Sequence, residues 1–177
     1  MQLIPAATQS QYSQIEALYQ TAFPACERKP FSLILEKQTA GQVDLFYLEQ
    51  DALFSGLAIT MKHQDLVLLD YFAITAVRRQ KGLGCRALNT LFEHYQGNRF
   101  FLEIESTQEE ADNKAQRRLR KQFYLKNKMT ELGLYANVFG TEMELLSYQT
   151  LLTYEEYISV YQAVYGPEKA ACIKRLP

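Results

Sequence analysis

Three apolar segments follow one another in the middle of the chain, and only short turns separate them. Val43 to Glu49, Leu53 to Lys62 and Leu66 to Ile74 are rich in Leu, Val, Ile, Phe and Tyr. The intervening Gln50-Asp51 and His63-Gln64-Asp65 are typical of turns. We therefore expect three antiparallel strands joined by hairpins, because two strands linked by a tight turn must run in opposite directions.

The segments on either side alternate between helical and strand patterns. Met1 to Ile4 fits a short first strand, Ser10 is the expected N-cap of a first helix that Pro24 ends, and Phe31 to Thr39 fits a second helix. Further helices are expected over 84–95, 113–127 and 154–165, and further strands over 99–105, 134–139 and 142–148. This order predicts an α/β chain whose mixed sheet is mostly antiparallel in its first half.

The length of 177 residues predicts a single domain, 1–177, large enough to fold without a disulfide or a structural metal. The three cysteines, Cys26, Cys85 and Cys172, are widely spaced and form no CxxC pair, which indicates reduced thiols in a cytoplasmic protein. No zinc-like cluster, signal peptide or long apolar run is evident, so we expect no metal and no membrane association.

Charge is unevenly distributed along the chain. The formal net charge is only -1, which excludes a protein whose whole surface binds polyanions. The segment from Arg78 to Lys128, however, contains 12 Lys and Arg residues and 6 Asp and Glu residues. The rest of the chain contains 7 basic and 14 acidic residues. The basic middle suits a phosphate-rich ligand, and the acidic flanks suit a cationic one.

The most informative segment runs from Leu66 to Leu88, where a buried strand leads through a basic, glycine-containing loop into a helix. The loop reads Arg79-Gln80-Lys81-Gly82-Leu83-Gly84, and we expect the helix to begin at the second glycine. Free N–H groups in the first turn of a helix and the helix dipole together make an anion site. Arg78, Arg79 and Lys81 add positive charge, so a diphosphate is the expected ligand.

Two other phosphate-binding patterns fit this loop less well. A Walker A loop requires Ser or Thr after Gly-Lys, which is absent here. Gly82, Gly84 and Ala87 match the Gly-x-Gly-x-x-Ala dinucleotide fingerprint, and Glu103 follows at about the expected distance. Residues 75–81 separate the fingerprint from its strand, however, and hairpins rather than parallel units precede it. A dinucleotide-dependent oxidoreductase is therefore the less favoured alternative.

The same loop resembles the (Gln/Arg)-x-x-Gly-x-(Gly/Ala) signature of the GNAT N-acetyltransferases. Leu69 to Ile74 looks like the fourth strand of that superfamily, and Phe123 to Asn127 is similar to its Phe-Tyr-x-x-x-Gly-Phe segment, with Lys128-Met129 in place of Gly-Phe. Asn113 stands where many members carry an asparagine. The resemblance in element order covers nearly the whole chain, and its specific motifs lie between Leu66 and Met129.

This resemblance implies a GNAT-like fold: a mixed, mostly antiparallel central sheet with splayed strands 4 and 5, flanked by helices. It implies acetyl-CoA as cosubstrate and transfer of the acetyl group to a primary amine by direct attack in a ternary complex. The coenzyme's pantetheine arm would lie along the fourth strand and its pyrophosphate at the following loop. The cofactor-binding residues expected are Tyr71, Phe72, Ala73, Ile74, Arg79, Gln80, Lys81, Gly82, Leu83, Gly84, Cys85 and Asn113.

Two proton transfers must accompany the reaction, one from the incoming ammonium and one to the leaving thiolate. By the family pattern, Tyr124 is the proton donor. For the base, Glu103 and Glu105 are candidates because they share one face of a central strand, and Asp70 is a further one. Glu27 and Arg28 lie in a loop region that often lines the acceptor pocket.

Other properties remain open at the level of sequence. Basic residues of the helix 114–128 are candidates for the coenzyme's 3′-phosphate, and we expect no nucleic-acid partner because no recognition fold accompanies them. The acceptor is a small-molecule amine or a peptide, and the protein is a monomer or a homodimer. A non-catalytic acyl-CoA-binding or regulatory module is the main alternative to an enzyme.

Overall fold

The computed structural model describes residues 1–25, 27–79 and 81–177. Its residues group into two compact units, which are described in turn. The first comprises Met1–Met61 and Leu69–Gln96, and the second comprises Lys62–Leu68 and Gly97–Pro177. The expectation of a single domain stays a prediction.

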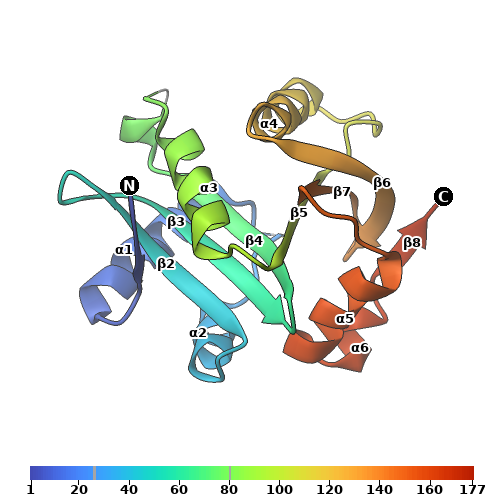
Figure 1. Ribbon diagram of the computed structural model, residues 1–177, viewed down its shortest axis with the longest axis horizontal. Coiled ribbons are helices and arrows are strands. Elements are labelled where there is room, and N and C mark those ends of the chain that lie inside the picture. The colour runs from blue at the N-terminus through green and yellow to red at the C-terminus, as the bar shows by residue number, and fades with distance from the viewer. Residues whose placement is uncertain (26, 80) are drawn as a thin grey trace. The chain divides into compact units, whose positions relative to one another are not determined.

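The first unit is an antiparallel arrangement of strands with helices on both of its faces. Its elements are β1 (Gln2–Pro5), α1 (Gln9–Ala22), α2 (Phe31–Thr39), β2 (Val43–Gln50), most of β3 (Leu53–His63) and β4 (Leu66–Ile74), the short 3-10 helix η1 (Ala76–Arg78) and α3 (Leu83–His94). β2 pairs with β1 and β3, placing Leu48 opposite Leu3 and Leu45 opposite Ile59. The expected hairpins are therefore confirmed (Figure 1).

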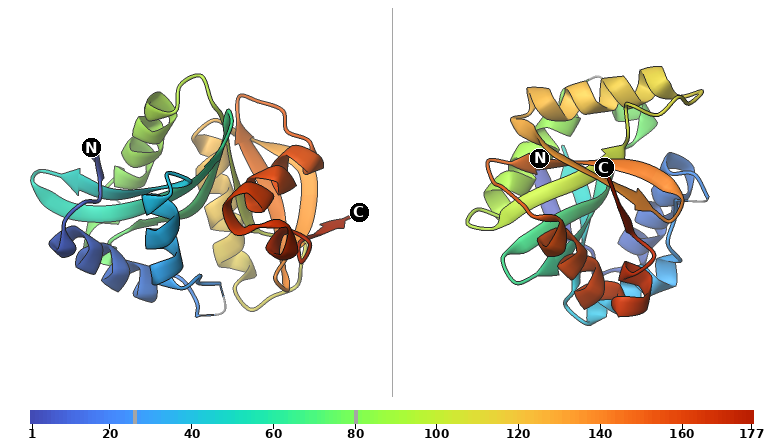
Figure 2. Two further views of the ribbon diagram at one scale, coloured as in Figure 1. Left: turned by 90° about the horizontal axis from the view of Figure 1, so that it is seen from below. Right: turned by 90° about the vertical axis from the view of Figure 1, so that its right-hand side faces the viewer.

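Helices α1 and α2 cover one face of these strands, and α3 covers the other (Figure 2). Their inward side chains form an apolar core in which Ile15, Ile34, Phe46 and Leu57 are almost fully buried. The expected N-cap Ser10 is wrong, because α1 begins after Thr8. The Thr8 hydroxyl accepts a hydrogen bond from Gln11 N at 3.3 Å, and Gln11 Oε1 accepts one from Thr8 N at 3.1 Å.

The second unit begins with the tip of the β3–β4 hairpin and continues to the C-terminus. Its other elements are β5 (Arg99–Glu105), α4 (Lys114–Lys126), β6 (Met129–Val138), β7 (Thr141–Tyr148), α5 (Tyr154–Tyr165), α6 (Pro167–Ala170) and β8 (Lys174–Leu176). The strand order is β1-β2-β3-β4-β5-β7-β6-β8, with antiparallel pairs between β5 and β7, β7 and β6, and β6 and β8. α4 and α5 lie on opposite sides of these strands (Figure 2).

The mixed, mostly antiparallel sheet flanked by helices is thus confirmed. Four elements differ from expectation: β6 starts at Met129 rather than at residue 134, and η1, α6 and β8 were not anticipated. A shift in the β6–β7 register between Glu131 and Tyr135, where Gly133 has a φ of 65°, interrupts the alternating pattern that would have revealed the longer strand. The splay of β4 and β5 involves both units and stays a prediction.

Candidate functional site

The turn from β4 into α3 exposes the N-terminus of a helix. Gly82 is the N-cap, with φ 72° and ψ 5°, and among the described residues no side chain makes a capping hydrogen bond here. The first helical hydrogen bond runs from Arg86 N to Gly82 O at 3.2 Å, so the N–H groups of residues 83–85 have no acceptor within the helix. The helix starts at Leu83, one residue before the glycine that we expected to begin it.

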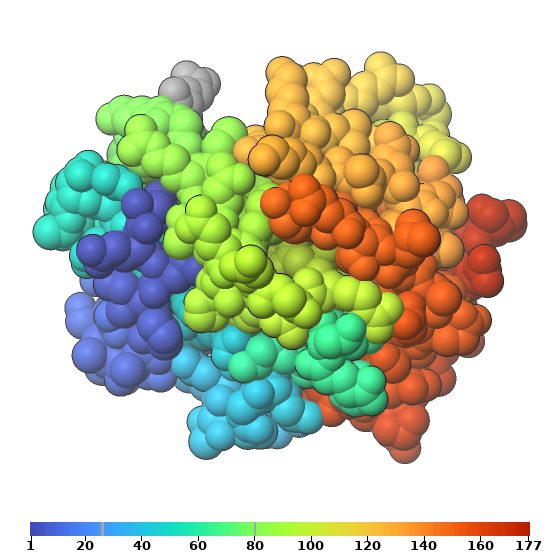
Figure 3. Space-filling view, in the orientation of Figure 1, coloured from blue at the N-terminus to red at the C-terminus, as the bar shows by residue number. Residues whose placement is uncertain are grey.

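Gly82 is required here by its backbone conformation rather than by crowding. Its φ lies in the left-handed region that L-residues avoid, whereas a Cβ built on it would meet no atom within 4 Å. The light green segment that contains the start of α3 reaches the molecular surface (Figure 3).

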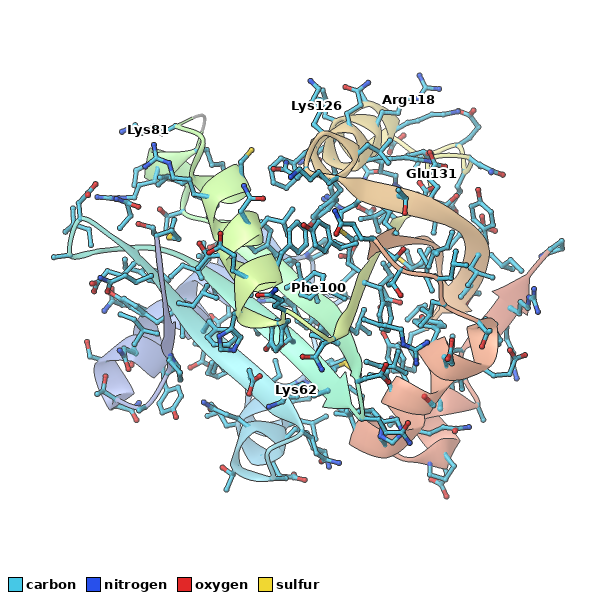
Figure 4. The ribbon with its side chains drawn as sticks, in the orientation of Figure 1. Lys62, Lys81, Phe100, Arg118, Lys126 and Glu131 are labelled. Carbon is cyan, nitrogen blue, oxygen red and sulfur yellow. The ribbon has the colours of Figure 1, made fainter. Side chains whose placement is uncertain are left out.

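Three exposed cations surround this helix start: Arg79, Lys81 and Arg86. Arg79 Nε donates to Ile74 O at 3.1 Å, which fixes its guanidinium beside the end of β4. Lys81 lies on the loop before α3 (Figure 4). The expectation that these cations and N–H groups bind a polyanion such as a diphosphate stays a prediction.

Arg78 differs from the other cations of this loop. Its Nη1 donates to Gln50 O at 3.1 Å and to Ser55 Oγ at 3.2 Å, so its guanidinium ties η1 to the β2–β3 hairpin. The sequence analysis counted Arg78 among the charges beside the anion site and missed Arg86, which lies one turn into α3. Gln80, another expected cofactor residue, lies outside the described residues, and the thiol of Cys85 is free and half-buried.

Strand β4 holds the loop between α1 and α2 through two adjacent side chains. The Tyr71 hydroxyl donates to Glu27 O at 2.7 Å and accepts from Lys29 N at 3.2 Å. The Asp70 carboxylate accepts two hydrogen bonds from Lys29 Nζ, at 2.7 and 2.8 Å. Asp70 is thus engaged by an ammonium group, which argues against its use as a base.

The two expected acceptor residues lie in this tethered loop. Arg28 Nη1 donates to Gln20 O at 2.9 Å, and Glu27 N donates to Pro24 O at 3.1 Å. Both side chains are partly exposed. The loop that would meet an acceptor is therefore fixed to β4, the strand expected to hold the coenzyme arm.

The rest of that expected coenzyme strand packs closely against β3. A Cβ on Gly56 would lie only 2.3 Å from Ala73 O, so Gly56 permits a close approach of the two strands. Thr75 N donates to Ser55 O at 2.9 Å, and the Phe72 side chain is partly exposed. The use of the β4 backbone by a coenzyme stays a prediction.

Tyr124, the expected proton donor, lies on the inner side of α4. Burial raises the pKa of its phenol to about 12, although the Arg120 guanidinium opposes this shift. Its side chain is 8% exposed, and within the described ranges its hydroxyl makes no hydrogen bond. A protonated phenol without an internal acceptor is suited to donate a proton to a bound group.

The two carboxylates of β5 have different surroundings. Glu103 accepts hydrogen bonds from two hydroxyls of α5: Tyr157 donates to Oε2 at 2.5 Å, and Tyr161 donates to Oε1. Both tyrosines are fully buried. Glu103 is therefore held by neutral donors from α5, in a setting that leaves it able to carry negative charge.

Glu105, by contrast, is surrounded by α4. It accepts from Asn113 Nδ2 at 3.0 Å and from Arg120, and it pairs with Arg117 Nε at 3.1 Å. Burial by itself raises the pKa of this carboxyl, but the Asn113 amide and the two guanidinium groups together hold it below its usual value. These contacts make Glu105 a poor proton acceptor and a strong structural anchor.

The contacts of Glu105 also account for Asn113, which was expected to bind the cofactor. While its Nδ2 donates to Glu105, its Oδ1 accepts from Arg117 Nε at 2.8 Å. Both ends of this amide are thus used within the protein. Asn113 organises the start of α4 rather than presenting a free side chain.

Several charges of the basic helix are paired internally. Lys121 Nζ lies 2.7 Å from Glu144 Oε2 and 2.8 Å from Glu131 Oε2, and Glu144 is buried. Arg118 and Lys126 instead point outward from α4 and are exposed (Figure 4). The cations of this helix available to a phosphate are therefore fewer than its sequence suggests.

Two further searches concern metals and membranes. Within residues 1–25, 27–79 and 81–177, no three His, Cys, Asp or Glu side chains gather as a metal site would require. The same residues contain no helix with the length and apolar character needed to cross a membrane.

Comparison with known proteins identifies the fold. The sequence matches no family model and no curated protein. The structure, however, is similar to a protein from Bacteroides thetaiotaomicron described as a GNAT-family acetyltransferase, with a TM-score of 0.79, 21% identity, and coverage of 94% of this chain and 99% of that one. The chain thus has the fold of the GNAT N-acetyltransferases, as its motifs indicated.

Two further solved structures share this fold at lower identity. An aminoglycoside 6′-N-acetyltransferase complexed with coenzyme A has a TM-score of 0.67 and 13% identity, over 83% of this chain and 96% of that one. The Escherichia coli ribosomal-protein-S18-alanine N-acetyltransferase has a TM-score of 0.62 and 18% identity, over 87% and 96%. The fold is therefore shared by enzymes with a small-molecule acceptor and with a protein acceptor.

Proposed function

We propose that this protein is an acetyl-CoA-dependent N-acetyltransferase that acts on a primary amine. The observation that carries the proposal is the N-terminus of α3, which begins after Gly82, has no side-chain cap within residues 1–25, 27–79 and 81–177, and is flanked by the exposed Arg79 and Lys81. In a GNAT fold this is the place where a coenzyme diphosphate is expected. The coenzyme-bound protein of the same fold supports the proposal.

The residues present fit coenzyme A. The N–H groups of residues 83–85 and the cations Arg79 and Lys81 would hold the diphosphate, and β4 from Tyr71 to Ile74 would hold the pantetheine arm. Gln80, Gly84 and Cys85 belong to the same proposed set. When bound, acetyl-CoA supplies an acetyl group already activated as a thioester.

The proton transfers are assigned to two side chains. Tyr124, protonated and without a hydrogen-bond partner among the residues that the structure describes, supplies the proton for the departing thiolate. Glu103, whose α5 partners are neutral hydroxyls, accepts the proton of the amine. Glu105 is the weaker candidate because two arginines and an amide already occupy it.

The acceptor is proposed to be a cationic amine, either a small molecule or a peptide. Outside residues 78–128 the chain holds 14 acidic and 7 basic residues, and Glu27 and Arg28 lie in a loop fixed to β4. An acidic surrounding attracts an ammonium group by long-range electrostatics. The known acceptors of proteins with this fold include both classes.

Calorimetry with acetyl-CoA, followed by a thiol-release assay with an amine panel, tests the proposal. We expect binding, and turnover that favours cationic over anionic amines. Arg79→Ala/Lys81→Ala should weaken coenzyme binding at least tenfold, whereas Lys169→Ala/Lys174→Ala, which removes two exposed lysines elsewhere, should not.

The other outcomes identify the alternatives. Binding of acetyl-CoA without transfer to any amine would support the non-catalytic module. Binding of NAD but not of coenzyme A would support the oxidoreductase. Absence of coenzyme binding at millimolar concentration would refute the proposed function.

A further inference from the structure

The Glu103 carboxylate is held by two tyrosines one turn apart on α5. We propose that Tyr157 and Tyr161 are positioning residues, which fix this carboxylate and keep it ionised so that it can accept the proton of the amine. The inference rests on the proposed function, because it assigns a role to two residues that support the proposed base. Both tyrosines are also fully buried.

The geometry gives each carboxylate oxygen its own donor. Tyr157 donates to Oε2 at 2.5 Å, and Tyr161 donates to Oε1. Residues four apart on a helix lie on the same face, so α5 presents both hydroxyls to β5 at once. The Phe101 ring, on the same face of β5 as Glu103, lies 6.3 Å from the Tyr157 ring and completes the contact. Two donors define the plane of a carboxylate as well as its position.

The chemical nature of the donors separates Glu103 from its neighbour Glu105. Arginines neutralise Glu105, whereas the hydroxyls of α5 stabilise the negative charge of Glu103 without cancelling it. Burial, followed by the proximity of Glu103, raises the pKa of Tyr157 well above its usual value. The tyrosine proton therefore stays on the phenol, where the hydroxyl can donate it in a hydrogen bond to the carboxylate.

Helix α5 is itself fixed in this unit, so it can hold the two tyrosine hydroxyls in place beside Glu103. Its N-terminus has a capping box in which Thr153 and Glu156 exchange hydrogen bonds. Glu156 also pairs with Arg99 Nη1 at 2.6 Å, and Arg99 binds Asp65 at 2.8 Å. Opposite Glu103 on β7 lies the apolar Leu145.

The other titratable groups near Glu103 within this unit are therefore defined. On β5 they are Arg99 and Glu105 with its arginines, on α5 they are Tyr154, Glu155, Glu156, Tyr157, Tyr161 and Tyr165, and on the paired strand β7 they are Glu142, Glu144 and Tyr148. Among these groups, Tyr157 and Tyr161 donate hydrogen bonds to the Glu103 carboxylate. Removing either hydroxyl therefore removes a hydrogen bond from the Glu103 carboxylate.

The test compares Tyr157→Phe, Tyr161→Phe and the double variant with Tyr154→Phe, whose hydroxyl donates to Ile173 O at 3.3 Å instead. Loss of a donor favours the protonated carboxyl, so the acidic limb of kcat/KM against pH should move to higher pH. We expect about one pH unit for each hydroxyl removed from Glu103. Tyr154→Phe should leave the limb in place, and KM for acetyl-CoA should stay within twofold in all variants.

A second measurement does not depend on turnover. Carbon-13 NMR of side-chain-labelled glutamate follows the Glu103 carboxyl in the free protein, with Glu103→Gln identifying its signal. The midpoint of its titration should rise in Tyr157→Phe and Tyr161→Phe and stay unchanged in Tyr154→Phe. An unchanged midpoint in the double variant would overturn the inference.

The outcomes distinguish this inference from the proposed function. An active wild-type protein whose pH profile is unmoved in the double variant, with only a lower melting temperature, shows that the tyrosines merely anchor α5. Full activity of Glu103→Gln likewise overturns the inference and leaves acetyl transfer intact. A wild-type protein that binds acetyl-CoA but transfers to no amine overturns both proposals.

Discussion

The ammonium of Lys29 lies 2.7 Å from Oδ1 and 2.8 Å from Oδ2 of Asp70, which joins the α1–α2 loop to β4. The Asp70 side chain is only 3% exposed, so a change that removes its partner leaves a buried charge. Lys29→Met should therefore lower the free energy of unfolding by about 3 kcal/mol. Urea denaturation at neutral pH measures this loss.

The matched control for Lys29 is Lys37, whose partner Glu36 is 67% exposed. Lys37→Met should change the free energy of unfolding by no more than about 0.5 kcal/mol. The double variant Lys29→Met/Asp70→Asn should recover part of the stability, because it no longer buries an uncompensated carboxylate. Equal effects of Lys29→Met and Lys37→Met would contradict this account.

Tyr124→Phe tests whether the unpaired phenol acts in chemistry rather than in folding. Its hydroxyl bonds to no group in the described part of the chain, so its removal should leave the free energy of unfolding unchanged within about 0.5 kcal/mol. Loss of a general acid should lower kcat by about 100-fold or more. Coenzyme affinity, measured by calorimetry, should stay within twofold. Unchanged turnover would remove Tyr124 from the mechanism.

Glu105 should make the stability of the protein depend on pH in acid. Its folded-state pKa lies below the usual value, so its contribution is present above the unfolded pKa of about 4.3 and is lost as the pH falls through the folded pKa. Glu105→Gln should lower the free energy of unfolding by about 2 kcal/mol at pH 7, where its charged hydrogen bonds are lost.

The difference between wild type and Glu105→Gln should then shrink as the pH is lowered from 5 to 2. Urea denaturation across this range measures the difference. Glu110, a fully exposed residue that pairs with Lys114, provides the control, and Glu110→Gln should have little effect at any pH. A constant difference between wild type and Glu105→Gln at all pH values would contradict the prediction.

The sequence predicted elements well where local patterns determine them. α2 spans Phe31–Thr39 and β5 spans Arg99–Glu105, as expected, because their apolar spacing and flanking residues are local signals. The hydrogen-bond and ion-pair partners of charged residues were harder to predict from the sequence. Glu103 and Tyr157 are 54 positions apart, and no local pattern reports which side chains meet across a sheet.

The loop before α3 illustrates the same limit within the predicted anion site. The glycine at position 82 and the cations Arg79 and Lys81 were recognised from their spacing, and the structure gives Gly82 the left-handed conformation that such a turn requires. The role of Arg78 was not predicted, since its acceptors, Gln50 and Ser55, lie on another hairpin. Composition and spacing predict which residues are available, whereas the fold decides which are already used.

Gly82→Ala should separate backbone strain from steric blocking. The added Cβ meets no atom within 4 Å, so only the left-handed φ of 72° opposes it, at roughly 1 to 2 kcal/mol of unfolding free energy. We expect that loss in urea denaturation, with weaker coenzyme binding in calorimetry because the N–H groups of α3 shift. Gly82→Asn, a residue that tolerates this conformation, should lose less stability. Equal losses in the two variants would point to another cause.

Lys128 occupies the position at which the Phe-Tyr-x-x-x-Gly-Phe motif of the GNAT N-acetyltransferases carries glycine. The residue follows the C-cap of α4, its φ is 68°, and its N–H donates to Leu125 O at 3.2 Å. This is the left-handed residue that commonly ends a helix and that favours glycine. The departure from the motif therefore changes the residue without changing the backbone conformation that the motif implies.

Lys128→Gly should consequently stabilise the protein. Relief of the left-handed strain is worth roughly 1 to 2 kcal/mol, and the greater freedom of glycine in the unfolded chain offsets about 0.5 to 1 kcal/mol of it. A net gain of about 0.5 to 1 kcal/mol is expected in urea denaturation. Lys126→Gly, inside the last turn of α4, should instead lose up to about 1 kcal/mol. If both variants were destabilised alike, position 128 would have no preference for glycine, and the match of this segment to the family motif would lose its physical basis.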